Sequence, residues 1–131
     1  MKVLVCEADA VLLSAIEFRL RKYGFDMKQT TLKDVSKKLE DYQPDLIILD
    51  TENNPAESLQ LVHRIKEKKA QMPIIIVSPL EDEEELWQAI QQGADDFVTK
   101  PFKLIELVLR VRRLLNSTEK TGDGSSLRIN I

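Results

Sequence analysis

Two charged residues that each end an apolar segment are the side chains best placed to do chemistry in this chain. Asp50 ends the segment Pro44–Asp50, and Lys100 precedes Pro101 near the end of the segment Gly93–Phe102. Short apolar segments of this kind predict buried β-strands, and the carboxyl ends of parallel strands form the edge at which open α/β folds carry out their chemistry. We therefore predict that the Asp50 carboxylate and the Lys100 ammonium lie together at one edge of a parallel sheet.

Strand and helix patterns alternate five times along the chain and would position these side chains. Apolar segments predict strands at residues 3–6, 25–27, 46–49, 74–77 and 97–98. Apolar residues at helical spacing predict a helix after each strand, and the helix starts and ends are marked by Asp9, Pro55, Gly24 and Gly93. Five such units predict a flavodoxin-like (βα)5 three-layer sandwich, an α/β fold with a five-stranded parallel sheet in the order 2-1-3-4-5.

Composition limits the classes of function. The chain has 131 residues, 43% apolar and 31% charged, and its net charge of −3 does not provide the broad basic surface typical of nucleic-acid binding. Its apolar segments are too short to span a membrane and its first residues lack the layout of a signal peptide, so we expect a cytoplasmic protein without membrane contact. Cys6 and His63 are single residues of their types; we expect Cys6 to pack as a small apolar residue and His63 to lie on the surface.

The pattern changes after Asn116, where the last helical stripe ends. Residues 117–126 contain two glycines and several hydroxyl residues, which is typical of a linker. Residues 127–131 alternate between apolar and polar, as at the start of a strand. We therefore predict one domain over residues 1–116, a linker over 117–126, and the start of a second, truncated domain over 127–131.

Three segments together make the sequence similar to a known family. Their sequences, over residues 93–102, 44–50 and 72–78, are Gly-Ala-Asp-Asp-Phe-Val-Thr-Lys-Pro-Phe, Pro-Asp-Leu-Ile-Ile-Leu-Asp and Met-Pro-Ile-Ile-Ile-Val-Ser. Over about residues 2–115 the chain resembles the receiver domain of a two-component response regulator, close to the OmpR/PhoB group. The resemblance implies a signalling domain rather than an enzyme, which a sensor histidine kinase phosphorylates, and a C-terminal effector domain through which alone DNA would be bound.

The resemblance also implies a role for each residue of the site. Asp50 would accept the phosphoryl group, Lys100 would supply positive charge beside it, and the hydroxyl of Ser78 would bind a phosphoryl oxygen. Phe97 would be the aromatic switch that packs inward after phosphorylation. Protein side chains contribute to phosphoryl transfer mainly by positioning and by electrostatic stabilisation, which suits this set of residues.

The acidic part of the site departs from the family pattern. Receivers usually carry two adjacent acids after the first strand, whereas this chain has Glu7 and Ala8, and Ala8 replaces the acid that contacts Mg²⁺ directly. Glu7, Asp50 and the backbone carbonyl of Glu52 would hold Mg²⁺ only weakly, because this ion requires a near-octahedral set of oxygen ligands. Two other departures are Ser58 at a glycine position and Pro79 at the position of a small residue.

These departures leave two kinds of function open. In the first, the chain is a phosphorylated switch with weak metal affinity. In the second, it is a receiver that works without phosphorylation as a dimerisation or interaction module. The presence of Asp50, Ser78 and Lys100 favours the first. Nucleotide or flavin binding is disfavoured, because the sequence has no glycine-rich phosphate loop.

Leu109 indicates a surface for self-association. It lies off the apolar stripe of its helix and is flanked by the charged residues Glu106, Arg110 and Arg113, so an exposed apolar residue is expected there. The resemblance implies a two-fold homodimer through the fourth helix, fifth strand and fifth helix. Its apolar patch would consist of Trp87, Ile90 and Leu109, with Asp95 or Asp96 of one subunit facing Arg110 or Arg113 of the other.

Overall fold

Strands and helices alternate along the chain. The structure is a computed structural model that describes residues 1–79 and 83–119, with the backbone alone for 117–119. The predicted order of five strand–helix units is confirmed, with the bounds β1 Lys2–Cys6, α1 Ala10–Lys22, β2 Asp26–Thr30, α2 Val35–Tyr42, β3 Leu46–Asp50, α3 Pro55–Lys68, β4 Ile74–Ser78, α4 Glu83–Gln92, β5 Asp96–Thr99 and α5 Leu104–Glu119.

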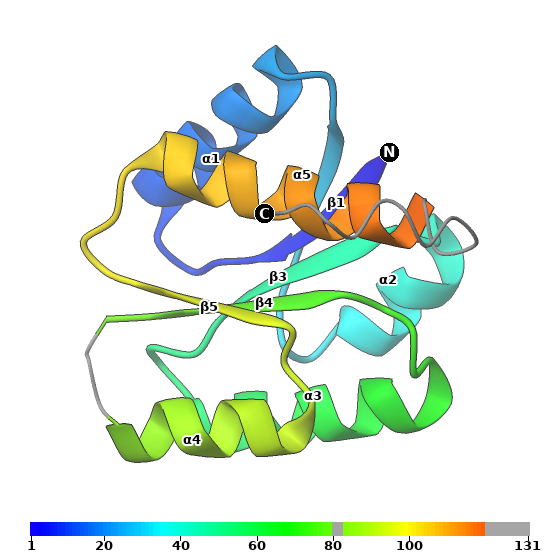
Figure 1. Cartoon of the computed structure of the whole chain (residues 1–131), viewed down its shortest axis with the longest axis vertical. Helices are drawn as coiled ribbons and strands as arrows, with labels where there is room; N and C mark the ends of the chain where they lie inside the picture. Colours follow the sequence, from blue (N-terminus) through cyan, green and yellow to red (C-terminus); the bar gives the residue numbers. More distant parts are fainter. Residues whose placement is uncertain (80–82, 120–131) are drawn as a thin grey trace.

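The strands form one parallel sheet in the order β2-β1-β3-β4-β5, as predicted. Figure 1 shows α1 and α5 on one face of the sheet and α2, α3 and α4 on the other. Parallel neighbours need a helical crossover, and placing these helices on both faces covers a sheet whose central strands are apolar throughout. All strands therefore end at the same edge, where Asp50 is in register with Val77 and Ser78 with Thr99.

The core has two halves because successive strand residues point to opposite faces. Val5, Ile48 and Val77 belong to the half beneath α1 and α5. Leu49 and Ile76, one residue along in their strands, belong to the half beneath α2, α3 and α4. Each fully buried side chain of this size contributes about 1.5–3 kcal/mol from the removal of apolar surface from water. The core thus holds rigidly the strands that carry the polar edge.

The predicted ends of the helices are confirmed. The Asp9 side chain accepts hydrogen bonds from the N–H groups of Val11 and Leu12 at 2.9 and 3.1 Å, which satisfies free donors at the start of α1. Pro55 is the first residue of α3. Gly24 and Gly93 follow α1 and α4 with φ of 94° and 112°, a backbone conformation that favours glycine.

Two elements differ most from their predicted bounds. β2 covers Asp26–Thr30 rather than residues 25–27, because it pairs with β1 along its whole length and an edge strand tolerates polar residues. α5 continues to Glu119, three residues beyond the boundary expected at residue 116. The remainder of the expected linker and the alternating segment 127–131 lie outside the described residues. Among the described residues, no helix is both long enough and apolar enough to cross a membrane.

Candidate functional site

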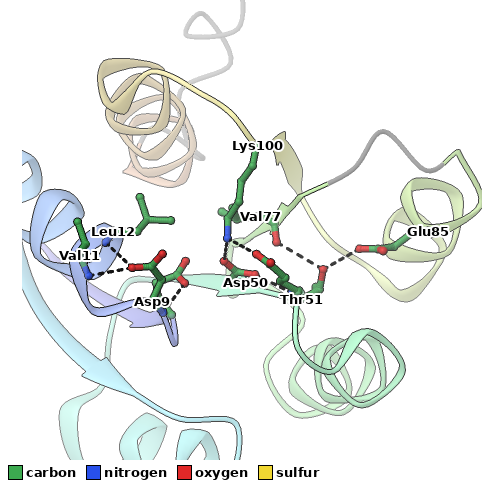
Figure 2. A network of polar contacts seen from close by, with 10 residues as sticks. Asp9, Val11, Leu12, Asp50, Thr51, Val77, Glu85 and Lys100 are labelled. Atoms are coloured by element: carbon green, nitrogen blue, oxygen red, sulfur yellow. Dashed lines mark hydrogen bonds and ion pairs between the residues drawn. The ribbon is translucent and has the colours of Figure 1, made fainter.

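Asp50 and Lys100 meet at the carboxyl edge of the sheet, as the sequence predicts. Asp50 is the last residue of β3, and Lys100 follows β5 directly before a cis bond to Pro101. The Lys100 Nζ lies 2.6 Å from Asp50 Oδ2, and the Asp50 side chain is 6% exposed. Figure 2 shows Lys100 extending from its strand end down to Asp50. A nearly buried carboxylate is thus paired with an ammonium.

Lys100 also contacts a second carboxylate. Its Nζ lies 2.8 Å from Glu52 Oε1, while the Glu52 N–H donates to Asp50 Oδ1 at 2.7 Å. Partial burial would lower the pKa of Lys100, but its hydrogen bonds to Asp50 and Glu52 outweigh that effect and raise the pKa above its ordinary value. Lys100 is therefore charged at neutral pH and provides a fixed positive charge beside Asp50.

Glu7 lies on the other side of Asp50, at the end of β1. Its pKa is raised from 4.5 to about 7, first by burial and then by a hydrogen bond with Asp50, while the Asp9 N–H bonded to its carboxylate acts in the opposite direction. Two carboxyl groups that lie within hydrogen-bonding reach of each other are more stable when they share one proton than when both are ionised. At neutral pH, Glu7 thus carries a proton for a substantial part of the time.

Ser78 provides a buried hydroxyl at the same edge. It is the last residue of β4, it is fully buried, and its Oγ has no hydrogen-bond partner among the described residues. An unsatisfied buried hydroxyl costs free energy, so a ligand oxygen at this position would relieve that cost. Ser58, where the family has glycine, is also buried, in the first turn of α3, and its hydroxyl has no hydrogen-bond partner in the described part of the chain. Phe97 is partly buried and packs against the core half beneath α2, α3 and α4.

An open cleft of about 830 Å³ lies beside Asp50. The loops after β1, β2 and β3 and the start of α3 form its walls, and Lys33 and Arg64 lie among its lining residues together with Glu7 and Asp9. This volume is within the range of small-molecule sites. The Asp50 carboxylate is therefore beside a space that could admit a small molecule.

The site has two carboxylates that could hold a cation. Among the described residues, no group of three or more acidic, histidine or cysteine side chains is arranged to bind a metal ion. Mg²⁺ is usually held by one or two carboxylates together with phosphate oxygens and water. Glu7 and Asp50 provide two such carboxylates, whereas Ala8, exposed between Glu7 and Asp9, has no side-chain oxygen. The residues therefore fit a Mg²⁺ site that has two carboxylate ligands.

Sequence reasoning did not find Thr51 and Glu85. Thr51 follows Asp50, is fully buried, and donates its hydroxyl to Glu85 Oε2 at 2.7 Å. Figure 2 shows this contact crossing from the strand end to α4. The two residues lie 34 positions apart, and no periodicity connects them, so only the folded chain reveals the pair.

The three residues predicted to form an apolar patch on α4 and α5 are exposed. Trp87, Ile90 and Leu109 have exposed fractions of 62%, 57% and 56%. Of the charged residues predicted beside this patch, Asp95, Asp96 and Arg110 form ion pairs within the chain. Arg110 lies 2.7 Å from Asp96 and 3.2 Å from Glu106.

Asp95 is held on another side of the domain. Its carboxylate lies 2.7 Å from Lys66 Nζ and accepts the N–H of Ile74 at 2.8 Å. Lys66 belongs to α3 and Ile74 begins β4. Asp96 rather than Asp95 is therefore placed beside α5, where Arg113 is also exposed.

Comparison with known proteins identifies the family. Residues 3–112 match the response regulator receiver domain. The chain belongs to this family. A receiver is a domain of a signalling protein, so the predictions of the family and of a non-enzymatic role are confirmed.

Its relatives among characterised proteins are transcriptional regulators. The chain is 26% identical over 128 residues to the alkaline phosphatase synthesis transcriptional regulatory protein PhoP of Bacillus subtilis, with 97% of the chain and 53% of PhoP covered. It is 30% identical over 125 residues to the transcriptional regulatory protein BasR of Escherichia coli, with 95% of the chain and 56% of BasR covered. The chain thus spans about half the length of these relatives.

Solved structures of receivers have the same fold. A Francisella response regulator receiver domain superposes with a TM-score of 0.81 at 27% identity, covering 89% of this chain and 98% of that one. An orphan response regulator of H. pylori has a TM-score of 0.80 at 33% identity, with coverage of 88% and 96%. These similarities agree with the strand order described above.

Proposed function

We propose that Asp50 accepts a phosphoryl group from a sensor histidine kinase and that the receiver thereby controls a DNA-binding output in the cytoplasm. The observation that carries the proposal is the 2.6 Å contact between Asp50 and Lys100. It lies at the same edge of the sheet as the buried hydroxyl of Ser78, which has no hydrogen-bond partner within residues 1–79 and 83–119. An acceptor carboxylate, a fixed cation and a free donor are what phosphoryl transfer requires of a protein.

Each side chain has a defined part in the transfer. An Asp50 carboxylate oxygen forms a bond to phosphorus, while the bond from phosphorus to the donor's imidazole nitrogen breaks and the nitrogen keeps the electron pair. Lys100 neutralises charge on the phosphoryl oxygens, and Ser78 donates its hydroxyl to one of them. Phe97 packs inward when Ser78 is engaged in this way.

Receiver domains typically bind Mg²⁺, and this chain offers Glu7, Asp50 and the carbonyl of Glu52 to hold it. The ion, when bound, supplies further positive charge to the phosphoryl oxygens. With Ala8 at the position of an acid, the proposal includes a low affinity for the ion.

Phosphorylation of purified protein tests the assignment of Asp50. Incubation with acetyl phosphate or a histidine kinase and Mg²⁺ should add one phosphoryl group, observed by mass spectrometry. Asp50→Asn should abolish the addition, whereas Asp41→Asn should not, because Asp41 is an exposed acid in α2 that pairs with Lys37. A phosphorylated Asp50→Asn protein would contradict the proposal.

A second function is favoured by the exposure of Trp87, Ile90 and Leu109, the three residues of the predicted apolar patch. In this alternative, the receiver dimerises through α4, β5 and α5 without phosphorylation. The Asp96–Arg110 pair would exchange between subunits and determine register more than affinity. A wild type that resists every phosphoryl donor and still dimerises would favour this alternative.

A further inference from the structure

Thr51 connects the acceptor strand to α4 through one short hydrogen bond. Its Oγ1 lies 2.7 Å from Glu85 Oε2 and 3.5 Å from the carbonyl oxygen of Val77. A hydroxyl has a single proton to donate, and the shorter contact, to a carboxylate, takes it. Because Thr51 is fully buried, breaking this bond would leave a polar group without compensation from water.

The surroundings of Thr51 are otherwise rigid. Its backbone N–H donates to Val77 at 2.9 Å, and Val77 is the residue in register with Asp50. Thr51 is therefore fixed relative to the acceptor by the sheet itself. Any freedom in the Thr51–Glu85 pair must come from α4.

α4 has little apolar anchorage of its own. Ala89 is the buried residue among the described residues Glu83–Gln92, whereas Leu86, Trp87 and Ile90 are exposed. A helix with so small a buried face depends more than its neighbours on polar contacts for its placement. The Thr51–Glu85 bond is at the N-terminal turn, two residues before Trp87.

We infer that Thr51 and Glu85 are positioning residues that hold the first turn of α4 against the acceptor strand, so that the state of Asp50 and the placement of the α4 patch depend on each other. This dependence is reciprocal because of thermodynamic linkage. If phosphorylation changes the free energy that favours one placement of α4, then contacts that fix this placement change the free energy of phosphorylation by the same amount. The link to phosphorylation rests on the proposed function, whereas the positioning of α4 does not.

Amide hydrogen exchange of α4 tests the positioning directly. Thr51→Val keeps the shape of the side chain and removes the donor, and Glu85→Ala removes the acceptor. Each should raise exchange in residues 83–92 about tenfold relative to the wild type, and Thr51→Val should add little to Glu85→Ala in the double variant, because both substitutions remove the Thr51–Glu85 bond. Emission from Trp87, the single tryptophan of the chain, should shift in the same variants.

Two controls separate this role from general effects on the helix. Glu83→Ala removes an exposed acid from the same turn and should leave exchange unchanged, which excludes loss of charge at the helix N-terminus as the cause. Glu85→Gln retains an acceptor oxygen and should restore most of the protection. Unchanged α4 exchange in both Thr51→Val and Glu85→Ala would overturn the inference.

The same proteins also serve to measure the coupling. The quantity is the ratio of the dimer dissociation constants without and with phosphorylation. That ratio should fall toward one in Thr51→Val and stay at its wild-type value in Glu83→Ala. An unchanged ratio in Thr51→Val would overturn the coupling. A wild type without phosphorylation on Asp50 would overturn the proposed function, and the exchange measurement would still decide the positioning.

Discussion

At the scale of single residues, the acidity of the site depends on the charges around Asp50. Lys100 contacts both Asp50 and Glu52, at 2.6 and 2.8 Å, and compensates part of their negative charge. Among the described residues no cation forms an ion pair with Glu7, and the pKa of its carboxyl group is raised to about 7. The site therefore gains and loses a proton close to neutral pH.

This raised pKa predicts a dependence of stability on pH. Between about pH 4.5 and 7 the folded chain binds more protons at Glu7 than the unfolded chain, so the free energy of unfolding should fall as pH rises through this window. Glu7→Gln should be less sensitive to pH there and more stable than the wild type near pH 8. Urea unfolding of both proteins at several pH values measures the difference. Parallel profiles would mean that Glu7 titrates normally.

Ala8 predicts the response to magnesium. Restoring the acid with Ala8→Asp places a third carboxyl group near Glu7 and Asp50. The repulsion between two like charges 4 Å apart costs about 1 kcal/mol in bulk water and about 4 kcal/mol at an effective dielectric of 20. Ala8→Asp should therefore melt lower than the wild type without metal and gain more from Mg²⁺. Thermal melting across a magnesium titration measures both effects. A large, saturable rise for the wild type at low millimolar Mg²⁺ would contradict the weak site.

At the scale of elements, the proposed apolar patch combines the exposed Trp87 and Ile90 of α4 with the exposed Leu109 of α5. Leu109→Glu places a charge in that patch and should weaken self-association at least tenfold if the patch is the dimer surface. Phe18→Glu is the matched control. Phe18 is 66% exposed on α1, a helix that lies beside α5 on the same face of the sheet but outside the predicted patch. Analytical ultracentrifugation should show loss of dimers in the first variant alone. Equal loss in both variants, or in neither, would refute this surface.

The end of α4 gives a second test at this scale. Gly93 has φ of 112°, and a Cβ there would lie 2.9 Å from Cγ of Lys66, the residue that pairs with Asp95. Gly24 has φ of 94° with nothing within 4 Å of such a Cβ. Both Gly→Ala variants should lose about 1–2 kcal/mol from backbone strain. Gly93→Ala should lose more than Gly24→Ala, since Lys66 must also move. Denaturant unfolding compares the two, and equal losses would show that Lys66 adjusts without cost.

At the scale of the whole molecule, the buried core of the described residues ends at Leu115. A chain that ends after Glu119 should keep the melting temperature of the full chain within about 2 °C, whereas one that ends after Leu114 should melt about 10 °C lower. The second deletion removes the buried Leu115, a loss of about 2–5 kcal/mol. Calorimetry of the three proteins measures both shifts. A large drop for the first deletion would place part of residues 120–131 in the folded unit.

The sequence alone determined the order of strands and helices, because apolar periodicity reflects which side of an element is buried. It also determined that Asp50 and Lys100 approach each other, since both follow apolar strands and parallel strands end at a common edge. The exposure of Leu109 followed from its place off the helical stripe. These are consequences of local patterns and of general rules of parallel sheets.

Only the tertiary structure decided which polar side chains bind each other across elements. Asp95 and Asp96 are neighbours with the same charge, yet one binds Lys66 of α3 and the other Arg110 of α5. Thr51 reaches Glu85 because the end of β3 and the first turn of α4 lie together in space. Such contacts depend on distances of about 3 Å between residues far apart in the chain, and periodicity, which reports only burial, carries no information about them.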